Sequence, residues 1–155
     1  MIESHTAPAG LAGPDEARAF LASNPDIEAV QLVITDLNGV GRGKNVAREE
    51  LDALYGPGRN VAGSILGLDV TGEDVEETGL VWSVGDADQC CRPVAGTLSR
   101  AGWLARPTAQ LLGTMYELDG RPAKADPRHV LARVVSRLGE RGLTPVVAVE
   151  LEFYL

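Results

Sequence analysis

Two glutamates lie two residues apart near the end of the chain, in the stretch V-A-V-E-L-E-F-Y-L (147–155). Apolar residues alternate with them, a pattern typical of a β-strand with Glu150 and Glu152 on one face. Carboxylates of this kind bind hard divalent cations, and each could hold one ion of a two-metal phosphoryl-transfer site. The alternative is a solvated strand face with two acidic residues, and the E-x-E pattern alone favours that alternative.

Two further motifs could suggest ligand binding. The glycine-rich run 38–45, N-G-V-G-R-G-K-N, lacks the first glycine and the final Ser or Thr of a phosphate-binding loop, because asparagine stands at both places. A glycine-rich hairpin is the better interpretation of this run. Asp86 and Asp88 flank one alanine and could bind a metal, but this composition is common in turns.

The histidines and cysteines give no metal-binding pattern. His5 and His129 lack a second histidine at ligand spacing, so both are predicted to be surface residues. Cys90 and Cys91 are adjacent, which is the wrong spacing for a zinc site and rarely allows a structural disulfide. Both cysteines are therefore predicted to be ordinary reduced thiols.

Local patterns predict the elements that must position these residues. Alternating apolar residues over 28–36, the dipeptide Asn38-Gly39 and a return segment over 40–46 predict a β-hairpin with a type I′ turn. The other expected elements are short helices at 14–23 and 48–54 and strands at 61–68, 80–84 and 111–118.

A longer helix is expected over 127–141, just before the two glutamates. Asp126 is its predicted N-cap, Pro127 suits its first turn and Gly142 suits the position after its end. The helix has an apolar face and, on its other side, a row of arginines. The apolar face consists of Val130, Leu131, Val134, Val135 and Leu138, and the arginines are Arg133, Arg137 and Arg141. The order of elements predicts a small mixed α+β domain up to about residue 115, followed by the opening elements of another domain.

Length and charge exclude several functional classes. The 155 residues carry a net charge of -8 and a pI of about 4.7, so no basic face is available to neutralise a nucleic-acid backbone. No apolar run approaches the roughly 20 residues that span a bilayer. The N-terminus also lacks a signal-peptide pattern. The sequence therefore predicts a cytoplasmic protein without a nucleic-acid or membrane partner.

Several motifs occur in the order found in the glutamine synthetase family. T-P-V-V-A-V-E-L-E-F-Y-L follows the D-P-R start of the long helix and resembles the strand that opens that family's catalytic domain. V-I-T-D-L-N-G-V-G-R-G-K resembles the hairpin of its N-terminal β-grasp domain, and G-S-I-L-G-L-D and L-L-G-T-M-Y-E-L-D-G lie between them. The resemblance covers about residues 25–155, and these motifs look most like the branch that joins glutamate to polyamines.

The resemblance implies an ATP-dependent ligase that joins the γ-carboxyl of glutamate to ammonia or an amine through a γ-glutamyl phosphate. Glu150 and Glu152 match two metal-binding glutamates of the family, which implies Mg²⁺ or Mn²⁺ as cofactor and ATP as co-substrate. Asp36 matches a hairpin aspartate that, in glutamine synthetases, reaches into a neighbouring subunit's site and helps deprotonate ammonium. The alternative is that Asp36 supports the Asn38-Gly39 turn. Sites shared between subunits imply a homo-oligomer, which is a double-ring dodecamer in this family.

The resemblance also divides the chain. Residues 1–25 are expected to form a tail and a short helix, 26–115 a β-grasp domain, and 116–155 the first helix and strand of a truncated catalytic domain. The chain is therefore expected to be a fragment that is inactive by itself, because most of the metal and nucleotide site would lie beyond Leu155. Two alternatives remain open: a non-catalytic relative that serves assembly or binding, and a freestanding β-grasp interaction module.

Overall fold

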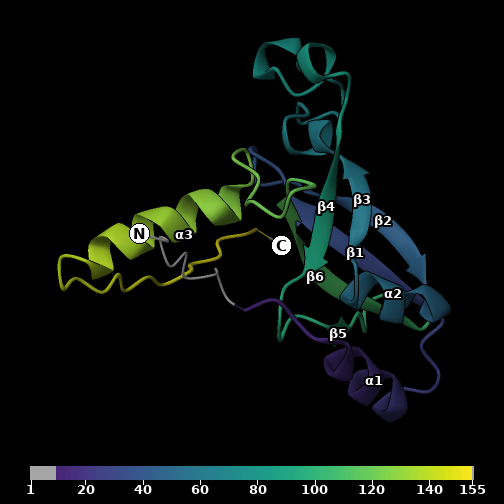
Figure 1. The fold of residues 1–155 in the computed structure, drawn as a ribbon. Helices are drawn as coiled ribbons and strands as arrows, with labels where there is room; N and C mark the ends of the chain where they lie inside the picture. The colour runs from purple at the N-terminus through teal and green to yellow at the C-terminus, as the bar shows by residue number, and fades with distance from the viewer. Residues whose placement is uncertain (1–9, 155) are drawn as a thin grey trace.

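A six-stranded mixed β-sheet organises the chain (Figure 1), and a computed structural model describes it for residues 10–154. The strands are β1 (Ala29–Thr35), β2 (Gly41–Ala47), β3 (Arg59–Ala62), β4 (Asp88–Pro93), β5 (Ser99–Arg100) and β6 (Thr108–Tyr116). Their order is β2-β1-β6-β4-β3, and β5 pairs with β6 off this path. β1 and β6 run parallel, whereas the other neighbouring strands are antiparallel. The prediction of a fold that mixes helices and strands is confirmed.

Helices and short 3₁₀ turns connect the strands. They are α1 (Pro14–Ser23), η1 (Arg48–Glu50), α2 (Leu51–Tyr55), η2 (Gly63–Leu66), η3 (Glu76–Thr78), η4 (Trp82–Val84) and α3 (Pro127–Gly139). α1 has the predicted bounds, and α3 begins at the predicted residue and ends two residues earlier than expected. None of the helices described over residues 10–154 is long and apolar enough to cross a membrane.

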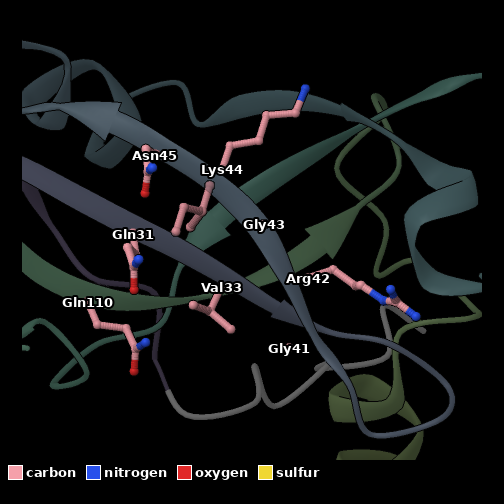
Figure 2. Close-up of a pocket in the computed structure, with 9 residues that line it drawn as sticks. Gln31, Val33, Gly41, Arg42, Gly43, Lys44, Asn45 and Gln110 are labelled. Atoms are coloured by element: carbon pink, nitrogen blue, oxygen red, sulfur yellow. The ribbon is translucent and has the colours of Figure 1, made fainter. Parts of the chain in front are cut away.

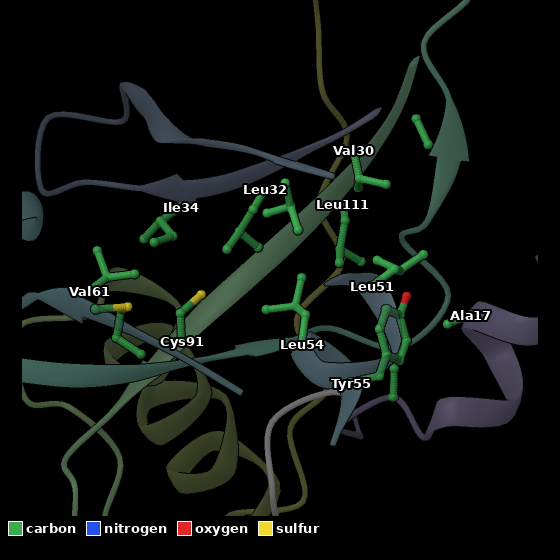
Figure 3. Packing of buried hydrophobic residues seen from close by; sticks show 14 of the residues in the cluster. Ala17, Val30, Leu32, Ile34, Leu51, Leu54, Tyr55, Val61, Cys91 and Leu111 are labelled. Atoms are coloured by element: carbon green, nitrogen blue, oxygen red, sulfur yellow. The ribbon is translucent and has the colours of Figure 1, made fainter. Parts of the chain in front are cut away.

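The hydrophobic core lies on the face of the sheet that α2 covers (Figure 3). Leu32 of β1 and Leu111 of β6 are buried there and belong to one cluster with Leu51 and Leu54 of α2. β6 needs a glycine at position 113, where its backbone packs closely against this cluster. A Cβ on Gly113 would lie 2.4 Å from the sulfur of Cys91, a distance that real Cβ atoms do not show. The core therefore fixes where β6 lies against β1 and β4.

The predicted hairpin is confirmed, but its turn is of another type. β1 and β2 pair from Ala29 opposite Ala47 to Thr35 opposite Gly41. In the turn, Gly39 N–H donates to the Asp36 carbonyl at 3.1 Å, and Gly39 has a φ of 78°. Asn38 has no positive φ, whereas a type I′ turn needs one at both central residues. The type I′ prediction is therefore wrong, and the pattern is that of a longer hairpin loop with a glycine bulge.

Two strand predictions need correction around the middle of the chain, and one strand there was not predicted. The expected strand at 61–68 ends at Ala62 and becomes η2, and the expected strand at 80–84 contains η4 instead. Neither segment finds a partner strand at those residues, and a strand is stable only when it is paired. β4 was not predicted, because apolar and polar residues do not alternate clearly in its sequence D-Q-C-C-R-P, which also ends in proline. Pairing with both β3 and β6 makes it a strand nonetheless.

The expected strand at 147–155 is not present over the described residues 147–154. This segment has no regular secondary structure, and the side chains of Val147, Val149 and Leu151 are 83%, 86% and 84% exposed. No strand among residues 10–154 pairs with it. An alternating sequence pattern does not form a strand by itself, because the backbone N–H and C=O groups need a partner.

Candidate functional site

Asp36 is held inside the hairpin turn. Its side chain is 1% exposed, and Oδ1 accepts hydrogen bonds from the N–H groups of Asn38 and Val40, both at 2.8 Å. Oδ2 accepts a hydrogen bond from Arg42 Nε at 2.9 Å, which makes a nearly buried ion pair. These contacts favour the turn-supporting alternative for Asp36, because both carboxylate oxygens already have partners. A role in amine deprotonation stays a prediction.

The same turn is tied to the segment that follows η2. The Asn38 side-chain amide donates to the Leu68 carbonyl at 2.7 Å, and Arg42 Nη2 donates to the Asp69 carbonyl. Arg42 therefore bridges the Asp36 carboxylate and the backbone of residue 69. These charge-assisted hydrogen bonds connect the tip of the hairpin to the start of the next loop.

A shallow groove of about 380 Å³ crosses β2, β1 and β6 on the sheet face opposite the core (Figure 2). Gln31 and Gln110 are directly opposite in the β1–β6 register, and their side chains lie next to each other in Figure 2. Gly41 and Gly43 leave the backbone of β2 uncovered beside Val33. The groove is lined by the amides of Gln31, Asn45 and Gln110 and by Arg42 and Lys44, with no carboxylate or imidazole, so it offers hydrogen bonds and positive charge.

A buried polar network joins β6 to the start of α3. Asp126 Oδ1 accepts from Arg128 N–H at 2.8 Å and so caps the helix as predicted. Asp126 Oδ2 accepts from Met115 N–H at 2.7 Å and from the Thr114 hydroxyl at 2.8 Å. His129 Nε2 lies 2.8 Å from the Met115 carbonyl oxygen, and because a carbonyl only accepts, this nitrogen carries the proton and donates. The first turn of α3 is thereby fixed to the sheet.

The prediction that His129 is a surface residue is wrong. Its side chain is 2% exposed, and its ring makes an edge-on contact with Tyr116 at 4.8 Å between centroids. No local pattern predicts this burial, because the groups that surround the ring belong to Thr114, Met115 and Tyr116 of β6.

The two cysteines are free thiols, as predicted. Cys91 is fully buried in the core, and burial raises the pKa of its thiol to about 12. The thiolate is the reactive form, so Cys91 is chemically inert at neutral pH. Cys90 is partly exposed and donates to the Pro57 carbonyl at 3.3 Å.

Glu150 and Glu152 are both exposed and make no ion pair with any residue described between 10 and 154. Within the same range no three His, Cys, Asp or Glu side chains are grouped closely enough to hold a metal ion, and Asp86 and Asp88 are also exposed. Carboxylate oxygens suit Mg²⁺ or Mn²⁺ in donor type. The described chain therefore offers two suitable ligands but not a complete metal site.

Comparison with known proteins identifies the class of this fold. Residues 124–155, which contain α3 and the two glutamates, match the family model of the glutamine synthetase catalytic domain. The fold is similar to the crystal structure of a novel glutamine synthase homolog, with a TM-score of 0.62, 24% identity and coverage of 74% of this chain and 27% of that chain. A GmaS/ADP complex gives a TM-score of 0.61 and 26% identity, covering 79% and 25%. The chain belongs to the glutamine synthetase family.

Three individual relatives are similar to the chain over nine-tenths of its length or more. The chain is 40% identical over 146 residues to gamma-glutamylputrescine synthetase PuuA of Escherichia coli, covering 94% of this chain and 31% of the relative. It is 31% identical over 144 residues to glutamate–isopropylamine ligase of a Pseudomonas species, covering 90% and 30%. It is 32% identical over 154 residues to gamma-glutamylethanolamide synthetase GlnA4 of Streptomyces coelicolor, covering 98% and 32%. The chain thus spans about a third of the length of these relatives.

The junction between β6 and α3 gives a first testable prediction. Replacing Asp126 with Ala removes the helix cap and leaves the Met115 N–H and the Thr114 hydroxyl without their acceptor. We expect the free energy of unfolding to fall by roughly 2–4 kcal/mol. Urea unfolding followed by circular dichroism measures the change.

Asp119→Ala is the matched control, because Asp119 lies on the surface and bonds only to Arg121. Its loss should cost less than about 1 kcal/mol. Equal losses for the two variants would contradict the assignment of Asp126 as the residue that holds α3 on the sheet.

Proposed function

We propose that the chain is part of an ATP-dependent ligase that joins the γ-carboxyl group of glutamate to an amine. One observation carries the proposal: the segment that matches the family's catalytic domain is the segment in which the Asp126-capped helix leads to Glu150 and Glu152. The relatives that resemble the chain over nine-tenths of its length or more are named for glutamate ligation to putrescine, isopropylamine or ethanolamine. Their shared chemistry supports an amine as the acceptor.

The reaction has two steps. The γ-carboxylate of glutamate attacks the γ-phosphorus of ATP and releases ADP, which leaves a γ-glutamyl phosphate. The amine then attacks the acyl carbon, loses a proton and displaces inorganic phosphate. Both reactants of the first step are anions, so catalysis depends on positive charge placed between them.

A divalent cation, Mg²⁺ or Mn²⁺, would supply this positive charge when bound. Glu150 and Glu152 are the residues of this chain that would hold it, since both are exposed carboxylates on a segment that begins at the end of α3. Two residues of spacing along an extended backbone place both side chains on one side of the chain. The remaining ligands and the nucleotide-binding groups would come from the rest of the ligase.

We also propose how the chain divides and assembles. Residues 26–115 would form a β-grasp domain, preceded by a tail and helix over 1–25, and 116–155 would begin the catalytic domain. The proposal is supported by the hydrophobic core, which is built from the sheet, α1 and α2 and contains no residue of α3, while Asp126 holds the start of α3 on β6. The ligase would act as a homo-oligomer.

Charge removal at the two glutamates tests the metal assignment. In the protein expressed from its complete gene, Glu150→Gln and Glu152→Gln should each lower kcat roughly 100-fold or more, because several kcal/mol of charge stabilisation depend on the ion. Calorimetric titration with Mn²⁺ should show weaker binding in both variants. Glu140→Gln, an exposed change at the end of α3, should leave kcat and Mn²⁺ affinity unchanged. Parental metal affinity in both Glu150→Gln and Glu152→Gln would refute the assignment.

The acceptor can be identified by kinetics with a panel of amines. Identity is higher to the putrescine-ligating relative (40%) than to a glutamine synthetase of Pyrococcus abyssi (32%). We therefore expect kcat/KM with putrescine to exceed that with ammonium by at least about tenfold, or about 1.4 kcal/mol in transition-state binding. Phosphate release with putrescine, ethanolamine and ammonium measures this preference. A clear preference for ammonium would move the protein to glutamine synthesis proper.

A further inference from the structure

Asn38 precedes Gly39 at the tip of the hairpin between β1 and β2, and both residues are exposed. Glycine has no side chain, so nothing beside its backbone nitrogen hinders an approach to the side-chain carbonyl carbon of the preceding asparagine. The other three asparagines of the chain precede bulkier residues. They are Asn24, Asn45 and Asn60, which precede Pro25, Val46 and Val61. The dipeptide at 38–39 is therefore the position in this sequence most open to deamidation.

Deamidation converts an asparagine side chain into a carboxylate in two steps. The Gly39 nitrogen gives its proton to the solvent and bonds to the side-chain carbonyl carbon of Asn38. The carbon–nitrogen bond of the side-chain amide breaks, and the leaving nitrogen takes up a proton and departs as ammonia. Water then adds to one of the two carbonyl carbons of the cyclic imide, whose bond to the Gly39 nitrogen breaks. The product is aspartate or isoaspartate, and water is the co-reactant.

The fold gives both reacting groups other partners. The Gly39 N–H donates to the Asp36 carbonyl at 3.1 Å, so the nitrogen that must attack is engaged in the turn. The side-chain amide of Asn38 donates to the Leu68 carbonyl at 2.7 Å, so the group that must be attacked is held against a distant loop. Ring closure needs both groups to leave these partners.

Arg42 strengthens the contact between the hairpin and this loop. Its guanidinium donates to Asp36 Oδ2 at 2.9 Å and to the Asp69 carbonyl. The Asp69 carboxylate shapes the loop in turn, because Oδ1 accepts a hydrogen bond from the Thr71 N–H at 2.8 Å. The side chains of Arg42 and Asn38 thus both bond to the backbone of residues 68–69.

A carboxylate at position 38 is incompatible with the contact to the loop. It has no hydrogen to donate, so two acceptors would face each other at the Leu68 carbonyl. It also adds a negative charge close to Asp36, whose Oδ1 accepts the Asn38 N–H at 2.8 Å. Isoaspartate changes the turn further, because its backbone runs through the former side chain and is one atom longer. The product therefore disfavours closure of the loop on the hairpin.

We infer that Asn38 is a deamidation site controlled by the contact between the hairpin and residues 68–69. Conversion is slow while the loop is held on the hairpin, because both reacting groups are then bonded elsewhere. It proceeds when the loop opens. The resulting carboxylate then keeps the loop open, so a transient opening becomes a permanent covalent change.

The rate of conversion in the intact protein tests this control. The protein expressed from its complete gene is incubated in mildly alkaline buffer, and peptide mass spectrometry follows the aspartate and isoaspartate forms of residue 38. The synthetic peptide T-D-L-N-G-V-G-R, residues 35–42, gives the rate without the fold. We expect conversion in the protein to be at least about tenfold slower, because it requires local opening. Asn45 and Asn60 in the same digest serve as internal references.

Two variants loosen the loop without touching the reacting dipeptide. Arg42→Lys keeps a positive charge beside Asp36 but lacks the planar fork that bonds both partners, and Asp69→Ala removes the carboxylate that shapes the loop. Each should speed conversion of Asn38 at least about threefold. Arg59→Lys is the matched control, since Arg59 makes an exposed ion pair with Glu50 at 3.5 Å, and its rate should equal that of the parent. Circular dichroism should show parental secondary structure in all three.

Asn38→Asp reproduces one product of the reaction and tests its effect on the loop. Hydrogen exchange of the backbone amides at 66–73, measured by mass spectrometry, should be faster in this variant than in the parent, because the loop has lost its hydrogen bond to residue 38. Both readouts are independent of turnover and therefore of the proposed ligase function.

Three outcomes would overturn the inference. Conversion in the protein at the rate of the peptide would show that the fold does not control the site. A parental rate in both Arg42→Lys and Asp69→Ala would show that the loop contact is not what slows the reaction. Parental hydrogen exchange in Asn38→Asp would show that the carboxylate leaves the loop closed.

Discussion

The carboxylate of Asp126 is the contact on which the arrangement of the chain depends. It accepts hydrogen bonds from the first turn of α3 and from the backbone of β6 at the same time, out of contact with water. The hydrophobic core packs on the sheet and includes no residue of α3, whose apolar face is exposed. Charge-assisted hydrogen bonds to Asp126, with the His129 donor to Met115, therefore set the direction in which α3 leads to Glu150 and Glu152.

Aspartates organise the loops in the same way elsewhere. Asp36 and Asp69 each receive several backbone N–H groups, and Arg42 links the two loops by contacting both residues. In all three cases the short side chain satisfies donors that would otherwise lack partners. The carboxylates of Glu150 and Glu152, which we propose as metal ligands, are instead exposed.

Local signals in the sequence were sufficient for the elements that depend on local interactions. The bounds of α1, the hairpin strands and the N-cap at Asp126 follow from proline, glycine and capping residues, and the structure has them where they were predicted. β4 and the burial of His129 depend on partners far away in sequence, so no local pattern could reveal them. The alternation around Glu150 is typical of a strand, but pairing decides whether one forms. The family resemblance supplied the candidate site residues, which periodicity alone could not distinguish from a solvated face.

The proposed ligase transfers the γ-phosphoryl group of ATP to the γ-carboxylate of glutamate, and an amine then displaces phosphate. Glutamate labelled with ¹⁸O in its γ-carboxyl group tests this directly, in a reaction with ATP and putrescine. Attack of a carboxylate oxygen on the γ-phosphorus places that oxygen in the phosphoryl group, and amine attack at carbon releases it as phosphate. Mass spectrometry should therefore find one ¹⁸O in each phosphate released. Phosphate without ¹⁸O, or phosphate release that does not require glutamate, would contradict the account.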